Sequence, residues 1–530
     1  MQRTALFTAA LLLCGSHAAA QSFRTIDGSS NNLNFPTMGQ AGIGLLRSSA
    51  PQYGDGLSTP SGASRPSARA VSNALSSQTG VLPNGKNASD YIWQWGQFVD
   101  HDIDLTPGAS PGESFDIDVP AGDPFFDPGG TGTVTIPLGR STWIQGGSGV
   151  RHQTNEITAW IDGSNLYGSD QARSLELRTN DGTGRLATSP HATGDLLPFN
   201  LNGFPNAPDD NDTSMFLAGD LRANEQSALT AMHTLWMREH NWLCDALANM
   251  YAGLPGELYY QVARAIVIGE MQQVTYEEYL PALLGPGGIP AYVGYDNAVT
   301  GSIGNEFSTA AYRFGHSMLS PTLLRLDSAG DVVSNGNLPL MDAFFNPDNI
   351  ISGGGLDPLL RGMASQVCSD SDLYIVDDVR NFLFGMPGSG GFDLISLNIQ
   401  RGRDHGLPDY NTVRVSYGLA PKATFAEISS DPAIVAGLTS TYATVNDIDP
   451  WVGAQAEDHV PGALVGELVQ ASLSDQFTRL RDGDRYYWEG YLPQFFKSWI
   501  NIQNLATVIR RNTGIGAELQ DDVFHVPIGG

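Results

Sequence analysis

A histidine and several polar neighbours stand on an otherwise apolar stretch between Tyr91 and Pro107. The spacing of the apolar residues predicts a helix that ends at or before Thr106, because proline disfavours the α conformation in the residue before it. Positions three or four apart share one helix face. That face carries Gln97, Asp100, His101 and Asp104. Asp102 points elsewhere. Such a polar strip is costly to bury unless a polar or metallic group faces it, so it predicts either a reactive site or a solvated helix face.

A second segment, 221–241, begins with a charged cluster and continues as the apolar stripe of a buried helix. The helix dipole stabilises acidic residues in a first turn, which explains Glu225 but gives Arg222 no role. His233 and His240 lie further along the same helix. We interpret both as structural histidines.

Two later segments, 311–321 and 397–408, each place a histidine beside arginine in an apolar setting. These histidines are His316 and His405. Neither spacing resembles HExxH or another set of zinc ligands. Taken alone, each histidine therefore favours a structural role over metal binding.

The elements that must position these residues are mostly helical. Gly and Pro are frequent at 107–150 and 283–305, which predicts long loops, and the clearest strand is Gly132–Pro137. The chain shows no internal repeat and no low-complexity linker. Helical periodicity dominates around 91–105, 225–250, 256–275, 370–385 and 463–480. We expect a mainly α fold with few short strands, in one large domain over 21–530. Its expected parts are an irregular N-terminal arm at about 21–90, a helical core at about 91–420 and a C-terminal helical part at about 421–530.

The first twenty residues predict a secretory signal peptide. They carry one basic residue, Arg3, an apolar run that ends at Cys14 and a small-residue stretch that ends at Ala20. We therefore expect a secreted or periplasmic protein that begins near Gln21. The apolar run is too short to span a bilayer, and no later segment approaches the roughly 18 apolar residues that a span requires.

The chain is strongly acidic, with 28 Lys and Arg against 56 Asp and Glu and a formal net charge of -28. This charge excludes nucleic acid and anionic membranes as expected partners. The two cysteines outside the signal peptide, Cys244 and Cys368, form no CxxC, CxxCH or zinc pattern. Export permits a disulfide between them, and two buried thiols fit the sequence equally well.

Together the four segments resemble the animal haem peroxidases of the peroxidase and cyclooxygenase superfamily, which includes lactoperoxidase, myeloperoxidase and peroxidasin. The resemblance begins at Phe23–Asn32, continues through Arg65–Asn73 and runs in the same order to Arg401–Gly406. It is weak after about residue 420. Ser30 stands where many animal members have cysteine, which suggests a bacterial-type member without their disulfides.

The resemblance implies haem b as cofactor and hydrogen peroxide as oxidant. His101 matches the distal histidine, which takes a proton from peroxide and returns it to the leaving oxygen. Arg222 matches the distal arginine, whose charge stabilises that oxygen, and Gln97 matches the amide that positions water or a halide. His316 matches the axial ligand of the iron, and Asn398 matches the residue bonded to its other ring nitrogen.

Further matches concern the attachment of the haem. Asp100 and Glu225 match two carboxylates that form esters with haem methyl groups in many members. Gln226 stands where myeloperoxidase has a methionine joined to the haem, so that link is absent and efficient chloride oxidation is not expected. The residues that match partners of the haem propionates are Asp104, Arg313 and Arg401.

The resemblance also implies a calcium site behind the distal helix, formed by Asp102 and the loop 158–164. In an extended loop alternate residues point the same way, so their oxygen atoms can converge on one cation. The expected loop ligands are Thr158, the Trp160 carbonyl, Asp162 and Ser164. Because Asp102 adjoins His101, the calcium ion would fix the helix that carries the catalytic base.

The expected activity is peroxide-driven oxidation of small donors: iodide, thiocyanate or bromide, and phenolic or aromatic compounds. One alternative is a fatty-acid dioxygenase of the same superfamily. Cyclooxygenases place a radical-forming tyrosine three residues before the axial histidine, where this chain has Arg313, and Tyr312 lies four before it. Another alternative is a non-catalytic exported calcium-binding protein, against which the complete distal and proximal sets argue. The physiological donor and the oligomeric state stay open.

Overall fold

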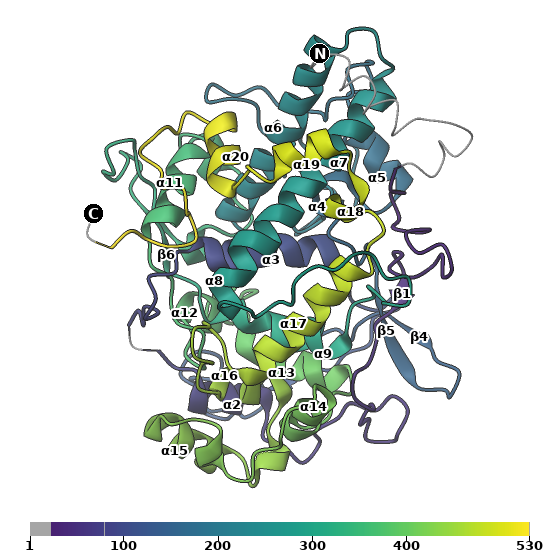
Figure 1. The fold of residues 1–530 in the computed structure, drawn as a ribbon. Coiled ribbons are helices and arrows are strands. Elements are labelled where there is room, and N and C mark those ends of the chain that lie inside the picture. Colours follow the sequence, from purple (N-terminus) through teal and green to yellow (C-terminus); the bar gives the residue numbers. More distant parts are fainter. Residues whose placement is uncertain (1–22, 79, 529–530) are drawn as a thin grey trace.

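The computed structural model describes residues 23–78 and 80–528, which form a helical body with a few short strands (Figure 1). The predicted signal peptide lies outside these residues. The helices before residue 300 are α2 (Ala68–Leu75), α3 (Tyr91–Ile103), α4 (Ser164–Tyr167), α5 (Gln171–Glu176), α6 (Ser227–Met250), α7 (Gly256–Val274), the π-helix η2 (Thr275–Tyr279) and α8 (Leu280–Leu284).

The second half of the chain is made of shorter helices. These are α9 (Asn305–Thr309), the 3₁₀ helix η3 (Ala311–His316), η4 (Leu340–Asp342), α10 (Asp348–Ile351), α11 (Asp357–Ser365), α12 (Asp377–Arg380), α13 (Leu394–Asp404), α14 (Tyr410–Ser416), η5 (Phe425–Glu427), α15 (Pro432–Thr441), η6 (Val445–Asp447), α16 (Pro450–Ala456), α17 (Glu467–Asp482), α18 (Trp488–Tyr491), α19 (Gln494–Ile500) and α20 (Leu505–Asn512). The mainly α fold class is confirmed.

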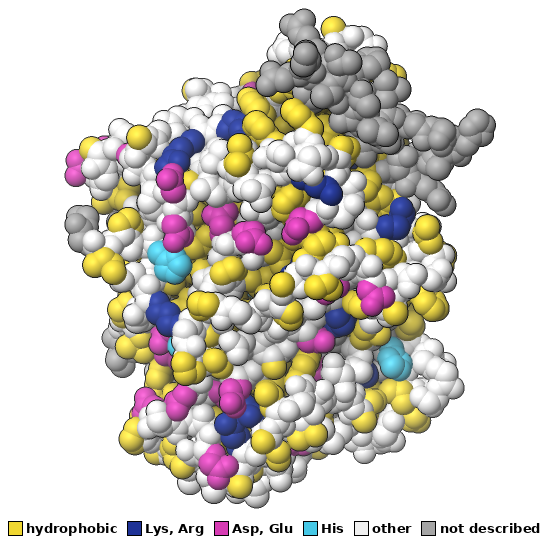
Figure 2. All heavy atoms as spheres, in the orientation of Figure 1, with side chains coloured by type: hydrophobic (Ala, Val, Ile, Leu, Met, Phe, Trp, Pro, Cys, Tyr) yellow, Lys and Arg dark blue, Asp and Glu magenta, His cyan; other side chains and the backbone are white. Residues whose placement is uncertain are grey.

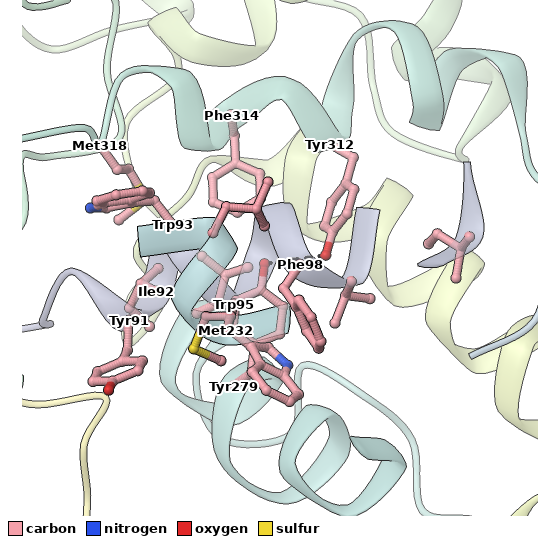
Figure 3. Close-up of a cluster of buried hydrophobic side chains, with 14 of the residues drawn as sticks. Tyr91, Ile92, Trp93, Trp95, Phe98, Met232, Tyr279, Tyr312, Phe314 and Met318 are labelled. Carbon is pink, nitrogen blue, oxygen red and sulfur yellow. Dashed lines mark hydrogen bonds between the residues drawn. The ribbon is translucent and has the colours of Figure 1, made fainter. Parts of the chain in front are cut away.

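Helix α3 runs through the middle of the molecule, where it packs against α4, α6, η2 and η3 (Figure 1). Its apolar side is anchored by aromatic side chains (Figure 3). The ring of Trp95 lies 5.8 Å from that of Trp236 on α6, and Phe98 stacks on Trp236 at 6.4 Å. All three are fully buried, and burial of one such side chain contributes about 2 kcal/mol or more. This packing fixes which way the opposite, polar side of α3 faces.

Three small antiparallel sheets complete the fold. β5 (Arg151–Asn155) lies between β1 (Ile43–Gly44) and β4 (Trp143–Gln145), and the other two sheets are the pairs β2 (Ile117–Asp118) with β3 (Thr135–Ile136) and β6 (Thr322–Leu323) with β7 (Leu338–Pro339). The last residue of β5, Asn155, donates from Nδ2 to the Ile103 carbonyl at 2.7 Å and accepts from the Leu105 amide at 2.9 Å. The first sheet thus holds the end of α3.

Four predicted helices are confirmed as α3, α6, α7 and α17, and the predicted strand appears as β3. The helix predicted at 370–385 is wrong, because only Asp377–Arg380 is helical there. The apolar residues of this stretch are buried as irregular chain that pairs with the N-terminal arm: the amide of Ile375 donates to Ser76 and that of Asp370 donates to Leu82. Tertiary pairing, and not helical periodicity, accounts for the apolar pattern.

Other expectations concern the thiols, the charges and the membrane. Cys244 and Cys368 are buried and free, so they do not form a disulfide with each other. In Figure 2, Asp and Glu side chains are scattered over the visible face among fewer Lys and Arg, without a continuous basic patch. Within 23–78 and 80–528, none of the helices is long and apolar enough to cross a bilayer.

Candidate active site

A cavity of about 360 Å³ lies between the polar side of α3 and the helix η3. Its wall includes the turn before α6, part of α13 and the loop after α12. Three histidines line it, His101, His316 and His405, each from a different part of the chain. Apolar side chains such as Phe344 and Leu397 close other parts of the wall. The cavity therefore combines an apolar interior with polar groups at chosen places, as ligand sites do.

The α3 wall confirms the helical reasoning about this segment. Besides Trp93 and Gly96, α3 and its C-cap place four polar residues on the cavity: Gln97, Asp100, His101 and Asp104. His101 is 3% exposed, so the solvated-face alternative is wrong for this residue. Its Nδ1 is buried and has no hydrogen-bond partner among the residues that the structure describes. Burial, followed by the nearby charge of Arg222, lowers the pKa of His101 well below its usual value, so the imidazole is neutral and can accept a proton.

Arg222 lies in the turn before α6 and not on the helix itself, which begins at Ser227. Its guanidinium forms a two-pronged pair with Asp220, from Nε to Oδ1 at 2.9 Å and from Nη2 to Oδ2 at 2.8 Å. Nη2 also donates to the Asp104 carbonyl at 2.8 Å. Burial would lower the pKa of Arg222, but Asp220 raises it above its usual value. A permanent cation is thus held beside His101.

Asp220 is a site residue that the sequence reasoning missed. Its side chain is fully buried, and besides Arg222 it faces His101, with 3.6 Å between Oδ1 and Nδ1 of the imidazole. The spacing Asp220-Leu-Arg222 was the available signal, since an acid two residues from a buried arginine is a candidate partner.

A chain of amides joins the distal wall to the start of α6. Gln97 Nε2 donates to Glu225 Oε1 at 3.2 Å, and Gln226 Nε2 donates to Gln97 Oε1 at 3.2 Å. Gln226 is also the N-cap of α6, because its side chain accepts from the Ala228 amide at 2.7 Å. These bonds fix the orientation of Gln97 toward the cavity.

Two carboxyl groups on the cavity wall have pKa values raised to near neutral pH. Burial, and then the charge of Asp104, raises the pKa of Asp100 to about 7. Burial raises the pKa of Glu225 to about 7 against the opposing charge of Arg222. Both side chains line the cavity, where a neutral carboxyl or an ester is less costly than a charge.

The proximal wall is formed by η3, whose last residue is His316. Asn398 on α13 donates from Nδ2 to His316 Nδ1 at 2.8 Å, and its Oδ1 accepts from Arg313 Nη1 at 3.2 Å. Burial and the charge of Arg313 lower the pKa of His316 to about 3, so this imidazole is neutral. A neutral histidine that lines a cavity and is oriented by an amide suits a metal ligand.

Two arginines that line the cavity, Arg313 and Arg401, are not fully neutralised by nearby carboxylates. Burial and the neighbouring Arg401 lower the pKa of Arg313, and burial lowers the pKa of Arg401 although Asp404 lies 3.1 Å from it. An anionic group in the cavity would relieve this excess of positive charge.

The other histidines of the four segments are structural. His405 lines the cavity, but both of its nitrogens are bonded to the protein: Nδ1 donates to Asn305 Oδ1 at 2.7 Å, and Nε2 accepts from Ser141 Oγ at 2.8 Å. His240 bonds to Tyr167 and to the Gly184 carbonyl. His233 packs edge-on against Phe98, with 5.1 Å between ring centroids, but among the described residues neither of its ring nitrogens has a hydrogen-bond partner, so the hydrogen-bonded role expected for it is not confirmed.

Asp102 faces away from the cavity and meets the loop that the sequence reasoning paired with it. Its Oδ2 accepts from the amides of Asp162 and Gly163 at 3.1 Å, and its carbonyl accepts from Ser164 Oγ at 2.7 Å. Thr158 Oγ1 donates to Asp162 Oδ1 at 2.8 Å. Burial and the charge of Asp162 raise the pKa of Asp102 to about 8.

The same cluster leaves one acceptor unused, because Oδ2 of Asp162 is buried and has no hydrogen-bond partner within residues 23–78 and 80–528. Trp160 is fully buried in the same loop. In the described part of the chain, no three His, Cys, Asp or Glu side chains converge as metal ligands, so a cation here would depend on two carboxylates with hydroxyl and carbonyl oxygens. Calcium accepts such an oxygen set.

Comparison with known proteins agrees with this arrangement. The family model described as "Animal haem peroxidase" matches residues 23–524. The chain belongs to the animal haem peroxidase family. It is 35% identical to peroxinectin A of Dictyostelium discoideum over 96% of both chains, and 35% identical to human eosinophil peroxidase over 96% of this chain and 77% of that one. It also matches the mouse peroxidasin homolog at 35% identity, of which it spans 38%.

Solved structures give the same assignment. Peroxidase A from Dictyostelium discoideum superposes with a TM-score of 0.88 at 34% identity, over 95% of this chain and 99% of that chain. The fatty acid alpha-dioxygenase of Oryza sativa has a TM-score of 0.80 at 21% identity, which shows a shared fold alone. As a member of this family the protein is a haem-dependent peroxidase, an oxidoreductase that uses hydrogen peroxide.

Proposed function

We propose that this peroxidase binds haem b in the cavity between His101 and His316 and uses it to oxidise small donors. One observation carries the proposal: a neutral imidazole beside a fixed arginine lines one wall of the cavity, and a neutral imidazole bonded to Asn398 lines the other. Bound haem would supply the iron that exchanges electrons with peroxide and donor.

The residues around the cavity fit this cofactor. Arg313 and Arg401 supply the positive charge that two propionates would neutralise, and Asp104 lies near them as a hydrogen-bonding carboxyl. His316 would hold the iron through Nε2, which leaves the proton on Nδ1. Asn398 would then turn its oxygen toward Nδ1, and this half-turn of the amide would give up the bond that the same oxygen accepts from Arg313 Nη1.

His101, Arg222 and Gln97, the distal residues, would each have a different role in the reaction with peroxide. His101 accepts a proton from the peroxide oxygen that approaches the iron and returns it to the oxygen that leaves as water. Arg222 stabilises the negative charge that develops on the leaving oxygen, and its pairing with Asp220 holds the guanidinium ready. Gln97 would position water or a halide in the cavity, since its bond to Glu225 orients the amide.

Asp100 and Glu225 are proposed to form esters with haem methyl groups. Each new C–O bond would replace a methyl C–H bond and a carboxyl O–H bond, and hydrogen peroxide would be the two-electron oxidant, reduced to two waters. The support is their place on the cavity wall and their pKa values of about 7, since a buried carboxyl that loses its charge in an ester no longer has to be solvated.

Calcium is proposed behind α3, held by the oxygen atoms of Asp102 and of the loop. The ligands would be Asp102, Thr158, the Trp160 carbonyl, Asp162 and Ser164. The support is the pair of buried carboxylates and the unused Asp162 Oδ2, which a divalent cation would satisfy. The role is structural, because the cation would tie α3 to a loop sixty residues later.

The proposed donors are iodide, thiocyanate, bromide and phenolic or aromatic compounds, and the proposed location is outside the cytoplasm. The test is a steady-state comparison of these donors and chloride with hydrogen peroxide on purified, haem-loaded protein. His101→Ala and Arg222→Ala should keep the Soret band yet react with peroxide on the order of 10²-fold more slowly. Oxygen uptake with unsaturated fatty acids and no peroxide would instead favour the dioxygenase, and failure to bind haem would contradict the proposal.

A further inference from the structure

We propose that Asp220 is a positioning residue that sets the orientation and the tautomer of His101 while it holds Arg222. This inference rests on the proposed function, because it concerns how the distal pair is prepared for peroxide. The carboxylate of Asp220 lies beside both groups. Its Oδ1 contacts Arg222 and faces His101, and its Oδ2 accepts a second bond from Arg222.

Asp220 Oδ1 is the shared atom. It accepts from the Arg222 amide at 2.7 Å and from Arg222 Nε at 2.9 Å, and it lies 3.6 Å from His101 Nδ1. Oδ2 accepts from Arg222 Nη2 at 2.8 Å. The guanidinium therefore cannot turn away without breaking a two-pronged pair, and the imidazole has one carboxylate oxygen behind it.

His101 needs that acceptor. Its Nδ1 is buried and has no other partner in the described part of the chain, whereas the ring lines the cavity. A proton on Nδ1 that points at a carboxylate leaves Nε2 free as the base, and the partner of one ring nitrogen decides the state of the other. The distance of 3.6 Å is longer than a hydrogen bond, and such contacts in active sites tighten when substrate binds. Burial would raise the pKa of Asp220, but the charge of Arg222 holds it well below its usual range, so the carboxylate is ionised.

The backbone holds Asp220 rigidly in this place. Its amide donates at 3.0 Å to the carbonyl of Asn165 in α4, the short helix that follows the loop facing Asp102. The preceding residue, Gly219, packs so closely on α4 that a Cβ there would lie 2.2 Å from the Ser164 carbonyl oxygen. Only glycine permits this approach. These two backbone contacts therefore fix the position of Asp220 beside Nδ1 of His101.

The test is the binding of cyanide to the ferric, haem-loaded protein, followed by stopped-flow absorbance. Hydrogen cyanide must give up its proton when it binds iron, so the rate reports the distal base without turnover of a donor. Asp220→Asn has nearly the same shape and should slow the second-order rate on the order of 10²-fold. The resting Soret band should stay in place. A rate within about twofold of the wild type would overturn the proposal.

A matched control separates positioning from stability. Asp449 is equally buried and forms the same two-pronged pair with Arg403, at 3.0 and 2.8 Å, outside the cavity wall. Asp449→Asn should lower the melting temperature as Asp220→Asn does, but leave the cyanide rate unchanged. Equal slowing in both variants would mean that loss of a buried ion pair is the whole effect, and the proposal would be wrong.

A double variant shows whether Asp220 acts through His101. In a His101→Ala background, Asp220→Asn should change the cyanide rate by less than about threefold, because the group it positions is absent. A further slowing on the order of 10²-fold in that background would contradict the inference. If Asp220→Asn does not hold haem, Asp220→Ala is assayed with added formate, where recovery of the rate supports the inference and no recovery overturns it. Wild-type protein that binds no haem would refute the proposed function itself.

Discussion

Removal of calcium should loosen the catalytic base without removing any catalytic group. Asp102 is fully buried and Asp162 is 1% exposed, and they face each other behind α3. With a cation between them both are ionised ligands. After chelation the two carboxylates repel, and at neutral pH Asp102 takes up a proton, since its pKa lies at about 8 without metal. The loop then loses its tie to the residue next to His101.

The size of the effect follows from linkage. A ligand present at a hundred times its Kd stabilises the folded state by about 2.7 kcal/mol. For a chain of this length the entropy of unfolding is about 1 kcal/mol per kelvin, so chelation should lower the melting temperature by about 3 °C. Peroxidase activity should fall with it, because His101 and Asp102 share α3.

The assay is prolonged chelation followed by elemental analysis, thermal melting and peroxidase activity on the same sample. Asp102→Asn should reproduce the loss, whereas Asp118→Asn, on the exposed side of β2, should change stability by no more than about 0.5 kcal/mol. A fully active and equally stable protein that elemental analysis shows to be free of calcium would refute the reasoning. So would an Asp102→Asn variant that behaves like Asp118→Asn.

Two further predictions concern histidine and glutamate. His316→Ala should lose the Soret band, whereas His405→Ala should retain it, because His405 has both nitrogens bonded to the protein; equal haem loss in both variants would break the axial assignment. Far from the cavity, Glu239 and Glu270 share Arg511, and burial raises the pKa of both carboxyls. Their contribution to stability is therefore complete below the unfolded pKa of about 4.3 and is lost as pH rises through the raised values. Glu270→Gln should flatten that decline in a series of melts at different pH, and an unchanged slope would contradict this.

Local periodicity was sufficient to predict the polar face of α3. Gln97, Asp100, His101 and Asp104 are related by helical spacing alone, and the structure places all four on one cavity wall. The spacing also separated Asp102 from them, and the structure places it against the loop 162–165. These relations are internal to one helix and its neighbouring loop, so they depend little on the rest of the fold.

Long-range pairing could not be predicted in this way. The stretch 370–385 has the composition of a helix, yet its backbone donors are used by Ser76 and Leu82, three hundred residues earlier. Asp220 was missed for a related reason: its partner His101 comes from another helix, and only the folded chain brings Nδ1 and Oδ1 within 3.6 Å. The C-terminal helices α16, α18 and α19 have only 7, 4 and 7 residues, too few for a helical period to show in the sequence, so packing on the core defines them.

The segment 158–165, which we propose to hold calcium, supports His101 and Arg222 by two separate routes. One is α3 itself, because Asp102, which contacts this segment, directly follows His101 on the helix. The other runs through Asn165, whose amide donates to Asp102 Oδ1 at 3.3 Å and whose carbonyl accepts from the amide of Asp220. Asp220 in turn faces Nδ1 of His101. The same segment therefore supports His101 in two ways: through the backbone of the adjacent Asp102, and through Asp220 beside the imidazole ring. The contact between His101 Nδ1 and Asp220 is long, at 3.6 Å. Because the backbone of His101 is also fixed, the two supports together account for the orientation of its imidazole toward the cavity.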